Sequence, residues 1–117
     1  GAVEAVVAAM RAHGDDGGVL EWAGRLLFGL ACDSVANQVR VTEAGGIDAL
    51  MAMRSPGGVD GVVAAMHEHG GSAWVQEQAC AALGNLVSGS PDNQARAGEA
   101  SAFEEVVAAM RAHGGAA

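Results

Sequence analysis

The chain has 117 residues, enough for one domain with a sizeable core, and half of them are hydrophobic. Six basic against fourteen acidic residues give a net charge of −8, which argues against nucleic acid and anionic membrane surfaces as partners and favours a basic partner. Charged residues and histidines keep every apolar stretch shorter than the roughly 18 residues of a membrane-spanning helix, so a soluble protein is expected.

Residues 3–13 form the first predicted helix. Its apolar side chains recur at i, i+3, i+4 and i+7 and therefore share one helical face: Val3, Val6, Val7 and Met10. Glu4 in the first turn and His13 in the last turn match the two ends of the helix dipole. Gly14, which follows, predicts a left-handed C-cap.

A longer helix is predicted over residues 19–30. Its apolar set consists of Val19, Ala23, Leu26, Leu27 and Leu30. In the segment that follows, residues 37–47 (NQVRVTEAGGI), the Gly-Gly pair predicts a turn. Gly45 and Gly46 are interpreted as connectors at that turn.

Residues 45–71 predict two successive short helices instead of one long helix. The first begins at Ile47, and Pro56-Gly57-Gly58 should stop it before the second begins at Val59. The glycines of this tripeptide are interpreted as connectors. The first short helix is amphipathic, and its apolar face must be buried against neighbouring helices or a partner: Ile47, Leu50 and Met51.

Residues 75–86 and 103–113 form the last predicted helices. The buried set of the former is Val75, Ala79, Leu83 and Leu86. The latter repeats the pattern of the first helix with Phe103, Val106, Val107 and Met110, and its last residue, His113, precedes Gly114, a further predicted left-handed cap. No alternating strand pattern competes, so the predicted fold class is all-α.

One motif recurs along the chain. Residues 3–14 return almost unchanged as residues 103–114, a third copy occupies residues 59–70, and a shortened fourth copy begins at Ile47. The shortened copy starts 44 residues after the first, and the last copy starts 44 residues after the third. This period lies within the roughly 40 to 47 residues of armadillo and HEAT repeats. The 12 residues from Ile47 to Val59 are additional to the period and form an insert.

Residues 37–47 resemble the first helix of the armadillo family running through its Gly-Gly turn into the second, and residues 75–86 (VQEQACAALGNL) resemble its third helix. The resemblance covers nearly the whole chain, with a HEAT-type array as the alternative. It implies a right-handed α-solenoid, an armadillo-like superhelix, whose regularity the extra mid-chain helix should interrupt. The implied single domain comprises repeat a (1–33), repeat b (34–89, with the insert) and an incomplete repeat c (90–117).

The family also implies where a partner would bind. In armadillo proteins the third helices line a concave groove, where an Asn near the helix end often binds the backbone of an extended peptide. Asn85 matches that position, whereas the first copy has Gly29 there. The Trp that precedes such an Asn in peptide-binding members is replaced by Ala81 and Arg25. The sequence therefore departs from the nuclear-import type of groove and predicts no Trp and Asn ladder.

Helical spacing places a candidate binding face on the two longer helices. With their apolar sets buried, the residues left on a second face include Trp22, Arg25, Trp74, Gln78 and Asn85. Trp and Arg dominate binding hot spots when they are exposed, so Trp22 and Arg25 should contribute more than Asn85. Two alternatives stay open: the Trp side chains cover the gap between stacked repeats, and Gln78 and Asn85 are solvated or satisfy a neighbouring backbone group.

The histidines and cysteines do not indicate a catalytic or metal-binding site. A histidine before Gly at the end of a helix is explained by the helix dipole. His67 and His69 are two residues apart and so point about 200° away from each other on a helix, which is wrong for shared zinc ligation. Cys32 and Cys80 are predicted to be buried free thiols, as in a reducing compartment such as the cytoplasm. Without a phosphate loop, nucleophile elbow or buried carboxylate pair, no catalytic residue, cofactor or metal is predicted.

Together these features predict a non-enzymatic scaffold that binds a protein or peptide along its third-helix face. The alternatives are a purely structural fragment of a larger repeat protein, and a small-ligand binder or enzyme with a pocket near the insert. The first and last helices are near copies of an internal one and do not resemble polar caps. Each end is therefore expected to expose apolar surface and to permit head-to-tail self-association.

Overall fold

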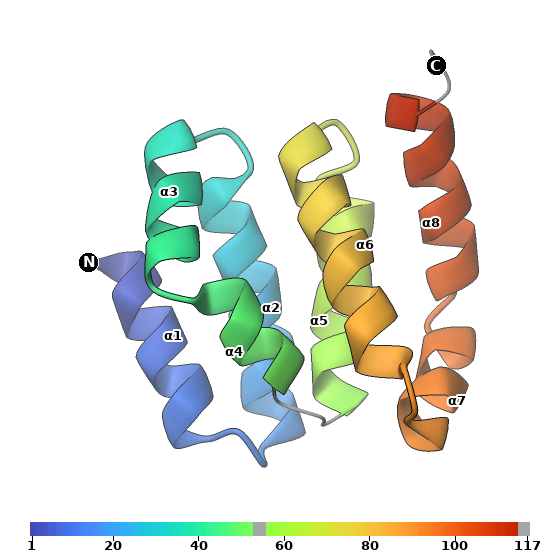
Figure 1. The fold of residues 1–117 in the computed structure, drawn as a ribbon, viewed down its shortest axis with the longest axis horizontal. Coiled ribbons are helices and arrows are strands. Elements are labelled where there is room, and N and C mark those ends of the chain that lie inside the picture. The colour runs from blue at the N-terminus through green and yellow to red at the C-terminus, as the bar shows by residue number, and fades with distance from the viewer. Residues whose placement is uncertain (53–55, 115–117) are drawn as a thin grey trace.

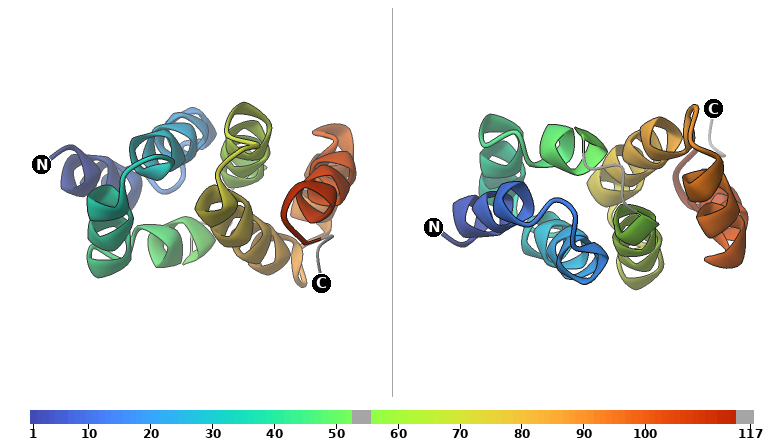
Figure 2. Two further views of the ribbon diagram at one scale, coloured as in Figure 1. Left: turned by 90° about the horizontal axis from the view of Figure 1, so that it is seen from above. Right: turned by 90° about the horizontal axis from the view of Figure 1, so that it is seen from below.

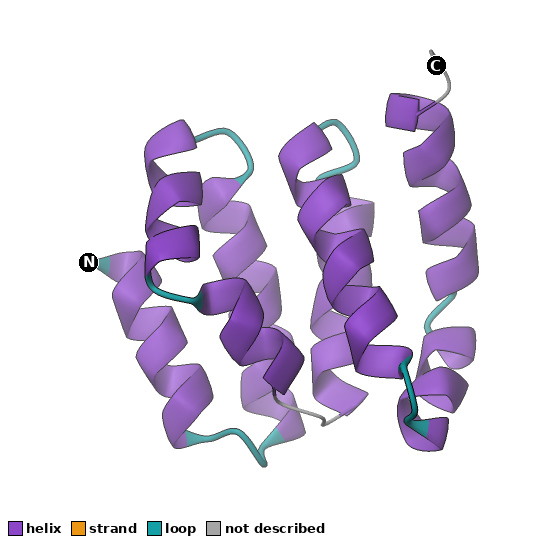
Figure 3. Ribbon diagram, in the orientation of Figure 1, coloured by secondary structure: helices purple, strands orange, loops and turns teal. Residues whose placement is uncertain are grey.

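The computed structural model describes residues 1–52 and 56–114, and these residues fold into eight α-helices and one π-helical turn, with no strand among them (Figures 1 and 3). The elements are α1 (Ala2–Ala12), α2 (Gly17–Ala31), α3 (Val35–Glu43), α4 (Gly46–Ala52), α5 (Pro56–Glu68), α6 (Ala73–Val87), α7 (Pro91–Glu99), α8 (Ala102–Ala109) and η1 (Met110–Gly114). The predicted all-α class is confirmed.

Polar side chains begin four of these helices. Asp16 caps α2, and Ser34, Ser72 and Ser90 cap α3, α6 and α7, each through a side-chain oxygen that accepts an N–H of the first turn. These caps satisfy donors that have no partner within the helix. Short connections follow, and α1 with α2, α2 with α3 and α5 with α6 form antiparallel hairpins, whereas α4 continues in the general direction of α3 (Figure 1).

The left-handed caps predicted at Gly14 and Gly70 are wrong. Among the described glycines, only Gly45 and Gly89 have such a backbone, each with φ of 70°. Helices α1 and α5 end instead in a tight turn, in which the carbonyl of the histidine after the helix accepts the N–H three residues further on, at 3.0 Å. That donor residue is already the N-cap of the next helix, so no left-handed residue is needed.

Helices α4 and α5 are separate, as the sequence predicts, although residues 53–55 between them lie outside the described residues. Pro56 is the first residue of α5, where the missing N–H of proline removes no helical hydrogen bond. Gly57 and Gly58 therefore belong to α5, and their interpretation as connectors is wrong.

Helix α4 buries its apolar face, as predicted for the insert. The Leu50 side chain is completely buried, and Ile47 and Met51 are partly buried against the same core. Neighbouring helices α1, α3 and α6 provide this cover. The insert is thus an integral part of the core.

The helices form two layers, with extents of 39 × 35 × 19 Å overall. Viewed end-on, α1, α2 and α5 form one layer and α3, α4 and α6 form the other, while α7 and α8 pack beside α5 and α6 at the end opposite α1 (Figure 2). The two predicted third helices, α2 and α6, therefore lie in different layers.

Helices α2 and α5 run side by side in the same direction and make the most extensive helix contact (Figure 1). Glycines allow their backbones to touch. A Cβ at Gly57 would overlap the carbonyl of Gly17, and a Cβ at Gly61 would lie 2.8 Å from the carbonyl oxygen of Glu21. These glycines explain why α5 lies against α2.

The predicted apolar faces differ in how well they are covered. The sets predicted for α1 and α6 are entirely buried. In α2, Ala23 and Leu27 are buried, whereas the other members of its set are only partly so. In α8 and η1, Phe103 is 76% and Met110 63% exposed. The expectation of an exposed apolar face at each end therefore applies to α8 but not to α1.

Candidate functional site

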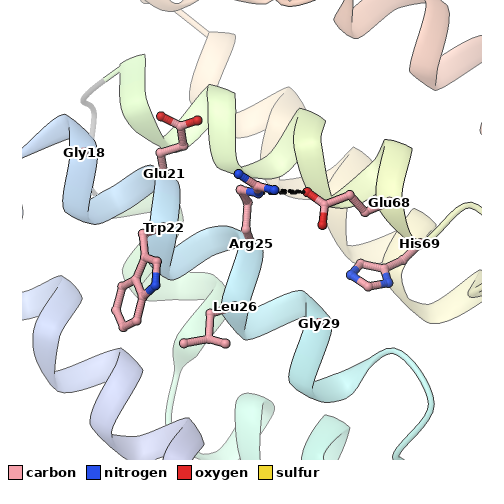
Figure 4. Close-up of a pocket in the computed structure, with 8 residues that line it drawn as sticks. All are labelled: Gly18, Glu21, Trp22, Arg25, Leu26, Gly29, Glu68 and His69. Carbon is pink, nitrogen blue, oxygen red and sulfur yellow. Dashed lines mark hydrogen bonds and ion pairs between the residues drawn. The ribbon is translucent and has the colours of Figure 1, made fainter.

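An open hollow of about 610 Å³ lies on the outer surface of α2 and the end of α5 (Figure 4). Its lining includes two of the predicted partner-binding residues, Trp22 and Arg25. The remaining residues around it are Gly18, Glu21, Leu26, Gly29, Glu68 and His69. Trp22 is 54% exposed, an unusual state for so large an apolar side chain.

Arg25 connects the two helices that form this hollow. Its Nη2 and Nε lie 2.7 and 2.8 Å from Glu68 Oε1. Both side chains are substantially exposed, so the pair contributes little stability and serves mainly to orient its two groups. The guanidinium charge is compensated by Glu68, whereas Glu21 has no hydrogen-bond or ion-pair partner among the described residues.

The hollow has two chemically different sides. Glu21 and Glu68 lie towards α5, and Trp22 and Leu26 lie on the side away from it, with Arg25 between them (Figure 4). Two carboxylates and one guanidinium leave a negative side next to an apolar one. Such a surface can accommodate a segment that carries a basic group and an apolar group.

Trp74 does not belong to this hollow. The Trp74 side chain is partly buried, and its ring centroid lies 6.2 Å from that of Phe28 at an interplanar angle of 60°. It also forms one wall of a smaller groove of about 260 Å³ between α3 and α6, where Val35 is 73% and Val39 48% exposed. Trp74 thus packs against Phe28 of α2 and lines the groove between α3 and α6, apart from Trp22.

Gln78 and Asn85 also lie apart from Trp22 and Arg25. Gln78 is partly buried on α6, and the exposed Asn85 amide donates to the carbonyl of Ala81 in its own helix at 3.4 Å. The five candidate residues do not form one face, because α5 and not α6 lies along α2. A periodicity argument treats the copies as equivalent and so misses this change of neighbour.

Sequence reasoning also missed Glu21, Glu68 and His69 as lining residues. The Arg25–Glu68 pair spans 43 positions, and no local pattern indicates a contact between such distant residues. The sequence indicates only a helix-end position for His69, yet its side chain lies over α2 where Gly29 has no side chain: a Cβ there would be 3.5 Å from His69 Nε2.

Two asparagines at equivalent positions, Asn37 and Asn93, have a structural role that the sequence does not indicate. Asn37 and Asn93 each donate from Nδ2 to a carbonyl at the end of the preceding longer helix, Leu30 and Leu86 respectively, at 2.7 Å. The glutamine that follows each asparagine makes an equivalent bond one residue further on. These amides fasten the preceding helix end to the start of α3 and α7.

The described residues hold few groups suited to chemistry. Within them, no three His, Cys, Asp or Glu side chains gather as a metal site would require, and no helix is long and apolar enough to cross a membrane. Cys32 and Cys80 are free thiols, partly buried, and burial raises the pKa of both. No family model, curated protein or solved structure matches the chain.

Proposed function

We propose that this protein is a non-enzymatic interaction scaffold, built from diverged armadillo-like repeats, that binds a basic and partly apolar segment of a partner protein. The binding surface is the hollow of α2 and α5. The observation that carries the proposal is a half-exposed Trp22 beside two carboxylates around an open hollow, of which Glu21 has no partner among the described residues. Tryptophan in such a position is typical of binding hot spots.

The repeated helix motif supports the scaffold class. Three nearly identical segments in one short chain are typical of arrays that bury a continuous core and bind partners on the surface. The right-handed superhelix is part of the proposal. In this protein α5 replaces a third helix beside α2, so the partner meets the surface of α2 and α5 instead of a ladder of third helices.

Charge supports the choice of a basic partner. The chain carries −8 overall, and a field of that sign steers a positively charged segment towards it. Glu21 provides the local anchor, because its carboxylate has no competing partner among the described residues. Trp22 and Leu26 then cover the apolar part of the bound segment, and Arg25 keeps Glu68 in position.

Fluorescence anisotropy with a labelled Lys–Leu repeat peptide, compared with its Glu–Leu counterpart, tests the proposal. We expect binding of the basic peptide only. Trp22→Ala and Glu21→Lys should each weaken it about tenfold, and the double variant Trp22→Ala with Arg25→Ala should also bind more weakly than the parent chain without unfolding.

The matched control is Glu77→Lys, which makes the same charge change at an exposed position on α6. If Glu77→Lys weakens binding as much as Glu21→Lys, net charge alone attracts the peptide and the hollow is not the site. If neither peptide binds at all, the chain has no such surface and a purely structural role is favoured.

A further inference from the structure

The last copy of the repeated motif differs from the other two in its exposure. At its first position, Val3 and Val59 are 2% and 0% exposed, whereas the aligned Phe103 is 76% exposed. Seven residues later, Met10 and Met66 are 0% and 1% exposed, whereas Met110 is 63% exposed. Phe103, Val107 and Met110 follow the i, i+4, i+7 spacing of one helical face. We call this surface of α8 and η1 the α8 face.

Charged residues lie at both ends of the α8 face. Glu104 follows Phe103 and Arg111 follows Met110, and both line the same shallow depression of about 290 Å³ with Val107 and Ala108. Neither charged group has a hydrogen-bond or ion-pair partner among the described residues. The neighbouring Glu105, by contrast, already has a partner within the chain, because its Oε1 lies 3.0 Å from His67 Nδ1.

The arrangement is self-complementary. If two copies of α8 pack antiparallel, Glu104 of each copy faces Arg111 of the other, and the two-fold axis passes midway between them, beside Val107 and Ala108. The small Ala108 side chain permits close approach at that point, and Phe103 of each copy lies near Met110 of the second copy. A parallel arrangement would instead place like charges opposite each other.

We propose that the α8 face is the interface of a symmetric homodimer, in which two α8 helices pack antiparallel with two reciprocal Glu104–Arg111 ion pairs. Each copy covers the apolar face that the other leaves exposed, as antiparallel neighbours in hairpins cover α1 and α5 (Figure 1). The contact is isologous and closed, so it gives dimers and not filaments. It is separate from the hollow of α2 and α5.

Charge reversal with sedimentation equilibrium tests this arrangement. Glu104→Arg alone, or Arg111→Glu alone, places like charges opposite each other twice in every dimer, so each should weaken dimerisation about tenfold. An equimolar mixture of the two variants should restore dimers, because each new Arg then faces a new Glu. The double reversal within one chain should restore the homodimer as well.

Matched controls change the same charge elsewhere: Glu77→Arg on α6 and Arg40→Glu on α3 are both exposed and should leave dimerisation within about twofold of the parent chain. Phe103→Asp should abolish the dimer while circular dichroism stays helical. A monomer up to several hundred micromolar overturns the proposal. A dimer that persists in Phe103→Asp overturns it too. The same holds if the equimolar mixture of Glu104→Arg and Arg111→Glu dimerises no more strongly than either variant alone. Peptide binding at Trp22 is measured in a separate experiment, so a failure of the dimer can be distinguished from a failure of the proposed function.

Discussion

Helices α1 and α8 start from nearly the same sequence and end in opposite environments. Residues 3–14 and 103–114 share the apolar spacing, the acidic first turn and the final histidine. Helix α1 is covered by α2, α3 and α4. Within the described part of the chain, the main neighbours of α8 are α5, α7 and its own continuation η1. The pattern of a helix thus determines which face is apolar, and its neighbours determine whether that face is buried.

Shortening the aligned methionines would show this difference most strongly. Met10→Ala removes a completely buried side chain and should lower the free energy of unfolding by about 2–5 kcal/mol. Met110→Ala alters a mainly exposed side chain and should change the free energy by about 0.5 kcal/mol or less. Urea denaturation of both variants at low protein concentration, where dimers are absent, measures the contrast. Equal losses would show that α8 is covered even in the monomer.

Two helical glycines provide a second contrast between buried and exposed positions. A Cβ at Gly61 would lie 2.8 Å from the Glu21 carbonyl, so Gly61→Ala should separate α2 from α5 and cost about 1–3 kcal/mol. Gly84 in α6 has nothing within 4 Å of such a Cβ, so Gly84→Ala should stabilise the fold by up to about 1 kcal/mol through helix propensity. Thermal denaturation should show shifts of opposite sign. Shifts of the same sign would exclude the backbone contact of α2 and α5 as their cause.

The sequence predicts the helices better than it predicts how they pack. Spacing located the buried faces of α1 and α6 correctly, and it separated α4 from α5, because periodicity and Pro56 act locally. It did not identify Gly61 as a contact between helices, since a glycine inside a helix and a glycine in a turn look alike in one sequence. The choice of neighbour depends on such long-range contacts.

The candidate site shows the same limit. Trp22 and Arg25 were selected by residue type and helical face, and the structure brings them together because they lie three residues apart on one helix. Gln78 was grouped with them by analogy between copies, and that grouping required α2 and α6 to be neighbours in one layer. The insert α4 lies next to α6, and α5 occupies the position beside α2. The neighbours of a helix, which its own pattern does not specify, therefore determine which residues share a surface with it.

The smallest contrast concerns the two equivalent asparagines. Asn93 is completely buried and Asn37 only partly, yet each donates one bond of 2.7 Å to the end of the preceding helix. Asn93→Ala should cost about 1–2 kcal/mol, because the carbonyl it leaves has little access to water, and Asn37→Ala about 0.5–1 kcal/mol, because water replaces the amide there. One factor reduces the difference: Asn93 Oδ1 is buried without a hydrogen-bond partner among the described residues, so the substitution also removes an unsatisfied acceptor. Urea denaturation of the two variants under the same conditions should show that Asn93→Ala is the more destabilising by about 0.5 kcal/mol. An equal or reversed order would mean that relief of the unpaired oxygen outweighs the lost donor, and that burial alone does not rank the two copies of this motif.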